Sequence, residues 1–135
     1  MGRLYYFVYT SFIAADFPPQ EIPGVVRAAL DTNRRLGLTG LLIFDGLRFC
    51  QYLEGPSAAL GGMLTVVSRD PRHVRFQVRE HATLLPGQRR FADSPLAYCR
   101  LDSQATALDE FGNLADRSAA SVLDRLRPTL VLESP

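Results

Sequence analysis

The sequence predicts an α+β protein in which strands and helices alternate along one chain of 135 residues. Three observations support this prediction. Short runs rich in β-branched and aromatic residues are typical of strands, and two longer segments repeat apolar residues at helical spacing. The pair Asp45-Gly46 between two apolar runs is a strong hairpin signal. Together these segments follow the order βαββαβ.

Five segments are expected to be strands. Residues 3–10 are apolar on both faces, which is typical of a strand in the middle of a sheet. Residues 38–45 and 47–53 form the hairpin, residues 74–84 alternate as a fourth strand, and residues 96–101 add a fifth. Because the first three strands are apolar on both faces, we expect both faces of the sheet to be covered.

Two segments between the strands are expected to be helices. The first, near residues 20–36, follows a loop with Pro18 and Pro19 and is ended by Gly37. The second covers residues 57–69. A split βαβ arrangement of this kind is ferredoxin-like, with two helices on one face of the sheet.

The residues after the fifth strand are expected to form C-terminal helices. An amphipathic helical pattern runs through residues 102–127 and is interrupted near Gly112-Asn113. We expect residues 1–101 to form the domain itself, and residues 102–127 to pack on the open face of the sheet or on a partner. Residues 128–135 are expected to be a frayed tail.

The composition favours an ordinary globular protein and excludes several classes of function. Apolar residues make up 47%, charged residues 21%, and the net charge of +1 gives no electrostatic footprint for nucleic acid or membrane. All 15 basic residues are arginine, which excludes Schiff-base chemistry and a phosphate-loop lysine. No membrane-spanning segment or signal peptide is visible, so a cytoplasmic protein is expected.

The two cysteines, Cys50 and Cys99, lie in strand-like segments. They form neither a Cys-x-x-Cys pair nor a Cys/His spacing typical of a metal site. We therefore expect two buried free thiols and no metal site.

The most informative polar residue is Gln51, an uncharged amide in the middle of an apolar hairpin strand. A buried amide without partners is costly, so either the protein or a ligand must form hydrogen bonds with it. In a ferredoxin-like sheet the first and third strands are neighbours, so Tyr9 can lie beside Gln51. Asn33, near the end of the first helix, can face the same groove between the helices.

Further residues around this groove would suit a flat heteroaromatic ring with amide-like edges. Val25 and Val67 offer apolar faces, and the amides of the groove offer both donors and acceptors. Asp70, Arg72 and His73 could bind a polyol or phosphate tail at the mouth of the groove.

Each of these features also has a plainer interpretation. Tyr9 can be a core aromatic residue, Asn33 a helix-end residue, residues 70–73 a solvated turn, and Arg89 and Arg90 surface charge. Taken singly, only the amide in the hairpin favours a functional site. The conjunction of all of them favours a ligand.

Five segments of the sequence together resemble the BLUF family, the blue-light sensors that use flavin. They are Tyr9-Thr10-Ser11, Asn33 followed by Leu38-Thr39-Gly40-Leu41-Leu42, Phe49-Cys50-Gln51-Tyr52-Leu53-Glu54-Gly55, Arg69-Asp70-Pro71-Arg72-His73 and Arg89-Arg90-Phe91. They span roughly residues 3–100 in the order and spacing of the family. The resemblance implies that residues 1–101 form a flavin-binding BLUF domain.

The resemblance implies non-covalent binding of FAD, or of FMN, between the two helices. The cofactor-binding residues it implies are Tyr9, Ser11, Val25, Thr32, Asn33, Gln51, Val67, Asp70, Arg72 and His73. Tyr9 would donate an electron and a proton to the excited flavin, and Gln51 would bridge Tyr9 to flavin N5 and O4. Gln51 would then rearrange, by rotation or tautomerisation, and the flavin band would shift slightly to the red.

The role implied is that of a photoreceptor and not of an enzyme. Its signal would pass through a homo-oligomer or a separate effector protein. Two other interpretations stay open: a BLUF-like scaffold without flavin that acts as an interaction module, and a small acylphosphatase-like enzyme. The loop at residues 11–16 has no glycine or arginine to hold a phosphate, which argues against the enzyme.

The sequence departs from the family pattern after Arg89-Arg90-Phe91. There the family usually carries a tryptophan and, two residues on, a methionine. This chain has Ser94 and Leu96 at those positions, and it contains no tryptophan at all. A switch that exchanges tryptophan and methionine near the flavin therefore cannot operate here in that form.

Overall fold

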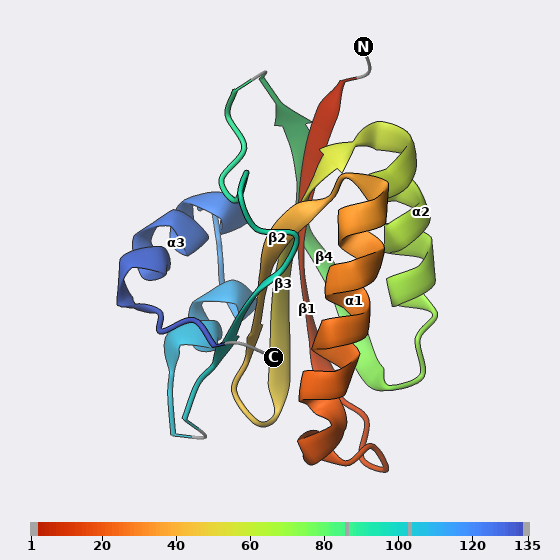
Figure 1. Cartoon of the computed structure of the whole chain (residues 1–135). Coiled ribbons are helices and arrows are strands. Elements are labelled where there is room, and N and C mark those ends of the chain that lie inside the picture. Colours follow the sequence, from red (N-terminus) through yellow and green to blue (C-terminus); the bar gives the residue numbers. More distant parts are fainter. Residues whose placement is uncertain (1–2, 86, 103, 134–135) are drawn as a thin grey trace.

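Five strands form one sheet that lies between two layers of helix (Figure 1). The computed structural model describes residues 3–85, 87–102 and 104–133. The strands are β1 (Leu4–Ile13), β2 (Thr39–Phe44), β3 (Arg48–Pro56), β4 (His73–Leu84) and β5 (Ala97–Arg100). The α-helices are α1 (Ile22–Leu36), α2 (Ser57–Ser68) and α3 (Ala119–Leu126), and the 3-10 helices are η1 (Pro19–Glu21), η2 (Ala107–Gly112) and η3 (Arg127–Thr129).

The strand order in the sheet is β4-β1-β3-β2-β5. β1 pairs antiparallel with β3 and β4, and β2 pairs antiparallel with β3. β5 runs parallel to β2 at the edge of the sheet. The first four strands have the ferredoxin-like arrangement and β5 extends it, so the predicted fold class is confirmed.

Local sequence signals explain how the elements around the site begin and end. α1 follows η1, so the α-helix starts slightly later than predicted, and it ends at Gly37, whose φ of 72° is left-handed. In the hairpin, Gly46 has a φ of 92°. The Asp45 carboxylate accepts hydrogen bonds from the backbone N–H groups of Leu47 (3.0 Å) and Arg48 (2.6 Å), which fixes the turn between β2 and β3.

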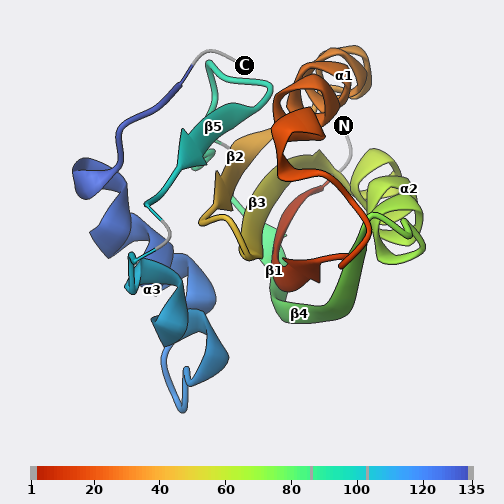
Figure 2. The same ribbon diagram turned by 90° about the horizontal axis from the view of Figure 1, so that it is seen from below.

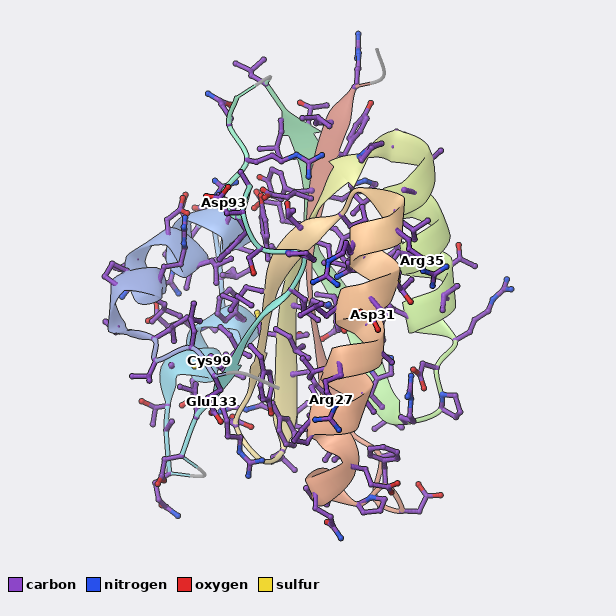
Figure 3. All side chains as sticks on the ribbon, viewed as in Figure 1. Arg27, Asp31, Arg35, Asp93, Cys99 and Glu133 are labelled. Atoms are coloured by element: carbon purple, nitrogen blue, oxygen red, sulfur yellow. The ribbon has the colours of Figure 1, made fainter. Side chains whose placement is uncertain are left out.

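α1 is amphipathic in the way that a helix on a sheet requires. Arg27, Asp31 and Arg35 lie exposed along its outer side (Figure 3), four residues apart. Val26 and Asn33 are buried on the inner side. α1 and α2 together cover one face of the sheet (Figure 2).

The sheet has an apolar core on each face. Between the sheet and α1 and α2 the fully buried side chains include Phe7, Val26, Leu38, Phe44, Leu53 and Leu60. On the opposite face the core includes Val8, Ile43, Tyr52, Phe111 and Leu123, so η2 and α3 provide the second cover (Figure 2). Cys50 and Cys99 are buried there as free thiols, as predicted.

The C-terminal residues continue to pack against the sheet. η2 ends at Gly112 and α3 begins at Ala119, so the helical pattern is interrupted where the sequence predicts. In the segment expected to be a tail, the backbone N–H of Glu133 donates to the carbonyl of Tyr98 in β5 (2.7 Å). Residues 134–135 lie outside the described residues. Within the described part of the chain, no helix is long and apolar enough to cross a membrane.

Candidate functional site

A cavity of about 250 Å³ lies between α1, α2 and the face of the sheet that they cover. Its walls are mainly apolar, with a few polar side chains at the sheet and at the mouth, which is typical of small-ligand sites. Lining residues from the sheet are Tyr9, Leu42, Phe49, Gln51 and His73; those from the helices include Ile22, Val25, Ala29, Thr32, Asn33, Met63 and Val67; Asp70 and Arg72 come from the partly exposed turn between α2 and β4, here called the mouth of the cavity.

All of the residues predicted for the site line this cavity except Ser11. The fold therefore brings nine of the ten residues together around one cavity. The sequence analysis did not single out Met63 and Val66, which also line the cavity. Met63 lies four residues before Val67 and three before Val66, and residues at these spacings share one helix face, so the spacing was a usable signal.

Tyr9 and Gln51 form the polar centre of the site. They are directly opposite each other in the pairing of β1 with β3, and the Tyr9 hydroxyl donates to Gln51 Oε1 at 2.6 Å. Tyr9 is 5% exposed and Gln51 is 6% exposed. Burial raises the pKa of Tyr9 well above its usual value, so its side chain is a neutral phenol that keeps its proton.

The amide of Gln51 is only partly used by the protein. Its Oε1 accepts from Tyr9, while its Nε2 has no hydrogen-bond partner among the described residues. Every fully buried side-chain nitrogen and oxygen among the described residues has a hydrogen-bond partner. Because Nε2 has none, it is not fully buried and is in contact with solvent. Since Gln51 lines the cavity, its amide N–H groups are available there to a ligand.

Asn33 lies almost fully buried on the inner side of α1 and also faces the cavity. Its Nδ2 donates to the backbone carbonyl of Pro95 at 2.9 Å. A side-chain amide has a second N–H and an acceptor oxygen, so Asn33 keeps hydrogen-bonding capacity for a ligand. Its backbone carbonyl accepts from Gly37 and Leu38, so Asn33 is a helix-end residue as well.

His73 is fixed by bonds from both of its ring nitrogens. Nε2 lies 2.7 Å from the carbonyl of Val67, which can only accept, so Nε2 carries the proton. Nδ1 lies 2.7 Å from Ser11 Oγ, which therefore donates to it in the neutral ring. The His73 ring packs edge-on against Tyr9 with 5.9 Å between ring centroids.

Ser11 thus lies behind the cavity wall, bound to His73, and does not line the cavity. Its hydroxyl orients the His73 ring. With both nitrogens of that ring engaged by the protein, His73 offers the cavity an aromatic edge and no free nitrogen for a phosphate or polyol.

Asp70 and Arg72 form a partly exposed ion pair at the mouth of the cavity. Arg72 Nε donates to Asp70 Oδ1 at 2.9 Å, and the backbone N–H of Arg72 donates to the same oxygen. These hydrogen bonds hold the pKa of the Asp70 carboxyl below its usual range. The guanidinium has further N–H groups for an anionic or hydroxyl-rich group at the mouth.

Thr32, Val25 and Val67 provide the wall of the cavity. The Thr32 hydroxyl donates to the backbone carbonyl of Ala28 at 3.2 Å, so its polar atom is turned back onto α1. Val25 and Val67 come from α1 and α2 respectively, so the cavity has an apolar side chain from each helix.

Arg89 and Arg90 are not free surface charges, and that expectation is wrong. Arg89 donates to the carbonyl of Gly37 (3.0 Å) and to the Thr39 hydroxyl (3.1 Å), so it binds the C-terminal end of α1. Arg90 makes an ion pair with Asp124 of α3, with a distance of 2.9 Å from Nε to Oδ1.

Ser94 and Leu96, which stand where the family usually has tryptophan and methionine, do not line the cavity. The carbonyl of Ser94 accepts from the backbone N–H of Gly40 at 3.1 Å. Leu96 is 2% exposed and packs in the apolar core on the side of α1 and α2. Among the residues directly after Phe91, Pro95 contacts the cavity wall, because its carbonyl accepts the hydrogen bond from Asn33.

The structure is a ferredoxin-like domain with a cavity between α1 and α2. A family description, "Sensors of blue-light using FAD" (BLUF), matches residues 4–97. The chain belongs to the BLUF family.

Individual relatives agree with this assignment. The dark-state structure of BlrB, a BLUF protein, superposes with a TM-score of 0.79 at 28% identity, covering 96% of this chain and 98% of BlrB. BlrP1 of Klebsiella pneumoniae, in a structure with FMN and cyclic diGMP, gives a TM-score of 0.68 at 31% identity, covering 92% of this chain and 36% of BlrP1.

The blue light- and temperature-regulated antirepressor BluF of Escherichia coli (strain K12) is 36% identical over 66 residues. That match covers 49% of this chain and 16% of the antirepressor. The chain therefore corresponds to a small part of this relative.

Proposed function

We propose that the chain binds FAD in the cavity between α1 and α2, and that Tyr9 and Gln51 carry its response to blue light. The observation that supports this most directly is the bond of 2.6 Å from Tyr9 to Gln51 Oε1, which leaves the amide nitrogen of Gln51 for the cavity. One half of the buried amide is satisfied by the protein. The other half has donors that suit the polar edge of a flavin ring.

The residues present fit an isoalloxazine ring and its tail. Val25 and Val67 would lie against the two faces of the ring, and the amides of Asn33 and Gln51 would bind its polar edges. At the mouth, the Asp70 carboxylate could bind hydroxyl groups of the cofactor tail, and the Arg72 guanidinium could bind its phosphate groups. FMN is the alternative cofactor, since a related BlrP1 structure is described with FMN.

Bound flavin would supply absorption of blue light and an excited state that takes an electron from a neighbouring phenol. Tyr9 is suited to give the electron and a proton together, because its buried phenol stays protonated. Because the Tyr9 O–H donates to Gln51 Oε1, this bond would carry the proton, and Gln51 would stay neutral by giving up one of its own N–H protons on the cavity side. A reversible response would require the electron and the proton to return to Tyr9.

Gln51 is the residue whose hydrogen bonds change after the transfer from Tyr9. An amide is the neutral side chain that can both donate and accept through a short bridge, so rotation or tautomerisation exchanges the two roles. In a pocket with little water, exchanging a donor for an acceptor is worth roughly 1–3 kcal/mol. A difference of this size shifts a two-state equilibrium by about one to two powers of ten.

We also propose that this chain is a photoreceptor and not an enzyme, and that its signal passes to a separate partner protein or to a second copy. We place it in the cytoplasm, without nucleic acid or membrane as partner. The net charge of +1 supports the last point. The alternative is a flavin-free scaffold that acts as an interaction module. It is motivated by Ser94 and Leu96, which replace the tryptophan and methionine that the family usually carries.

A light-minus-dark absorption spectrum of the freshly purified protein tests the proposal. A bound flavin band that shifts slightly to the red under blue light and recovers in darkness supports it. Bound flavin that does not shift contradicts the roles of Tyr9 and Gln51. Colourless protein that cannot be reconstituted with FAD or FMN favours the flavin-free scaffold.

A further inference from the structure

β4 forms one edge of the sheet, and its side away from β1 is here called the outer edge of β4 (Figure 2). Within the described residues, the backbone of β4 is hydrogen-bonded to β1 and to no other element. An edge strand of this kind presents a row of unpaired N–H and C=O groups to another chain. We propose that the outer edge of β4 binds an extended, acidic segment of a partner protein, which adds to the sheet as a further strand.

The opposite edge of the sheet, at β5, is covered by the chain itself. The backbone N–H of Glu133 donates to the carbonyl of Tyr98 at 2.7 Å, and the Glu133 carboxylate accepts the backbone N–H of Arg100 at 3.1 Å. β5 has only 4 residues, whereas β4 has 12. The longer of the two edges is therefore the one that is open to strand addition.

Positive charge without an ionic partner lies along β4. Arg75 and Arg79 make no ion pair within the described part of the chain. Arg79 donates to two neutral groups, the Thr10 hydroxyl at 2.8 Å and the Gln77 amide oxygen at 2.7 Å. The Arg75 guanidinium lies over the Phe12 ring, 5.6 Å from its centroid. Both charges are therefore left for an acidic partner.

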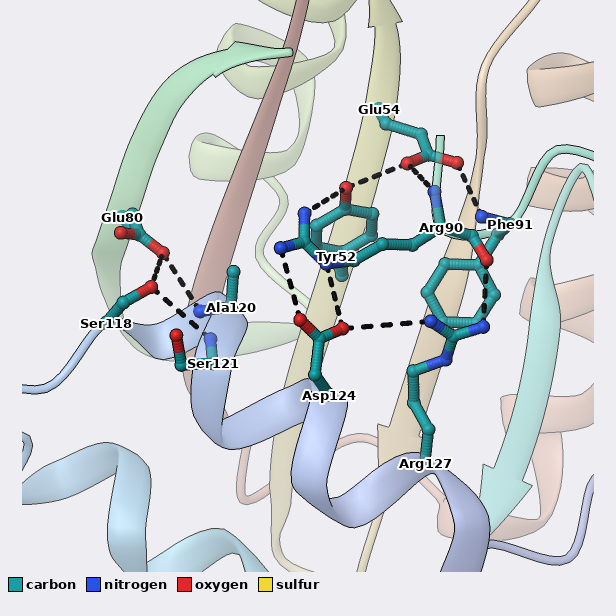
Figure 4. A network of polar contacts seen from close by, with 10 residues as sticks. All are labelled: Tyr52, Glu54, Glu80, Arg90, Phe91, Ser118, Ala120, Ser121, Asp124 and Arg127. Carbon is teal, nitrogen blue, oxygen red and sulfur yellow. Dashed lines mark hydrogen bonds and ion pairs between the residues drawn. The ribbon is translucent and has the colours of Figure 1, made fainter. Parts of the chain in front are cut away.

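Glu80 is the one acidic residue of β4, and it is directed to α3 (Figure 4). Its Oε1 accepts the Ser118 hydroxyl at 2.8 Å and the backbone N–H of Ala120 at 2.9 Å. Glu80 thus binds the N-terminal end of α3. It forms an ion pair with neither arginine of β4, so the strand keeps its positive charge.

The charge pattern favours an acidic segment over a second copy of this chain. Two β4 strands paired with each other would bring Arg75 and Arg79 of one copy close to the same arginines of the other, and like charges on opposed strands are destabilising. Acidic side chains of a partner strand would instead face these arginines. Its apolar side chains would contact Val74 and Val78, which are 47% and 43% exposed.

Titration of the full chain with a synthetic peptide tests the proposal. The probe is a capped peptide of alternating glutamate and valine, about ten residues long. NMR of the backbone amides gives the Kd and the hydrogen-exchange rates along β4. At a peptide concentration of about ten times Kd, exchange of the outer-edge amides should slow by about 10-fold, because the bound peptide accepts their hydrogen bonds.

A double variant and its control test the role of charge. Arg75→Gln combined with Arg79→Gln should weaken peptide binding by about 3-fold to 30-fold, the usual range for two exposed ion pairs. Arg27→Gln combined with Arg35→Gln makes the same change of net charge on the exposed side of α1 and should keep the wild-type affinity. Circular dichroism establishes that both variants are folded.

A second peptide tests strand addition itself. Proline in place of the central valines keeps every negative charge but removes backbone N–H groups, so this peptide should not slow exchange in β4. Equal binding of both peptides would show that charge alone attracts them and would overturn the proposal. Exchange in β4 that does not change with the first peptide overturns it as well, and so does a peptide-free dimer, detected by light scattering, in which β4 is already protected.

The binding surface requires the fold alone and no flavin, although it names a partner surface for the proposed photoreceptor. Slowed exchange in β4 of a protein that shows no red shift would therefore contradict the proposed function only. A normal red shift without any effect of the peptide would contradict this inference only.

Discussion

At Gln51, leucine has a side chain of similar size but without polar atoms, so it removes both the acceptor for Tyr9 and the free amide N–H groups. Because the cavity is mainly apolar, we expect Gln51→Leu to retain flavin. The light-induced red shift should be abolished, since no amide remains to exchange donor and acceptor. Light-minus-dark absorption of the loaded variant measures this, and a normal shift would contradict the role of Gln51.

Tyr9→Phe removes only the hydroxyl from the same pair and should also lose the red shift. Tyr5→Phe is its control, because Tyr5 lies on the same strand but does not line the cavity. The control should keep a normal shift. Loss of the shift in both variants would point to a general effect of the strand instead of the Tyr9 hydroxyl.

Asn33→Ala tests the second amide of the site. Loss of a buried hydrogen bond costs about 1–3 kcal/mol, so flavin should bind about 5-fold to 150-fold more weakly. Titration of the apoprotein with FAD, followed by flavin fluorescence, gives the affinity. Thr65→Ala is the matched control, because Thr65 is exposed on α2, its hydroxyl is bound to the carbonyl of Gly61 (3.2 Å), and it does not line the cavity, so the affinity should stay unchanged. Unchanged affinity in Asn33→Ala would remove this residue from the site.

At the scale of residues, the sequence predicted the pair of Tyr9 and Gln51 because strand alternation and strand order place them side by side. It did not predict the bond between Ser11 and His73, which are 62 residues apart. That bond depends on the pairing of β1 with β4, whose register is shifted by irregularities in the strands. Residue spacing carries no information about such a shift.

Among the elements, β3 carries Glu54, a fully buried carboxylate that accepts four hydrogen bonds. Glu54→Gln keeps the shape but replaces one acceptor oxygen by an N–H₂ group, which would face donors from Thr39, Tyr52 or the backbone. Since hydrogen bonds to charged groups contribute about 1.5–3 kcal/mol each, we expect the free energy of unfolding to fall by roughly 2–4 kcal/mol. Urea unfolding followed by circular dichroism measures it.

A matched control exists in η1. Glu21→Gln alters an exposed carboxylate outside the sheet and should leave the urea midpoint essentially unchanged. An equal loss in both variants, or no loss in Glu54→Gln, would show that the buried carboxylate does not hold β3 to the backbone of Arg90 and Phe91.

The elements that the sequence predicted well are those with periodic patterns and clear ends. α1 and the β2–β3 hairpin have apolar periodicity and end at Gly37 or turn at Gly46. The segment of residues 89–96 has no periodicity, and its structure depends on Asn33, Glu54 and Asp124, which lie elsewhere in the chain. The sequence therefore predicted its arginines as surface charge.

For the whole molecule, the order of the elements was enough to predict the sheet. The apolar character of both faces of β2 and β3 required a second cover, but it left open whether this chain or a partner provides it. The structure shows η2 and α3 in that place, with Phe111 and Leu123 fully buried. That choice depends on side-chain fit between segments that are far apart in sequence.

The last prediction concerns the whole molecule at alkaline pH. Burial raises the pKa of Cys50 from 9.0 to about 12 and raises the pKa of Tyr9 and Tyr52 above the 10.0 of a free phenol. The folded state therefore binds these protons more tightly than the unfolded chain. Stability should be constant below about pH 9 and fall as the pH rises further, by up to about 1.4 kcal/mol per pH unit for each group.

Urea unfolding midpoints at a series of pH values from 7 to about 10.5 measure this decline. Tyr52→Phe should give a shallower decline than the wild type, because one buried phenol no longer titrates on unfolding. A urea midpoint that stays constant across this range would contradict the prediction. It would mean that these groups have the same pKa in the folded and unfolded states, contrary to their burial. The same burial keeps the Tyr9 proton in place, so the red shift should persist wherever the fold does.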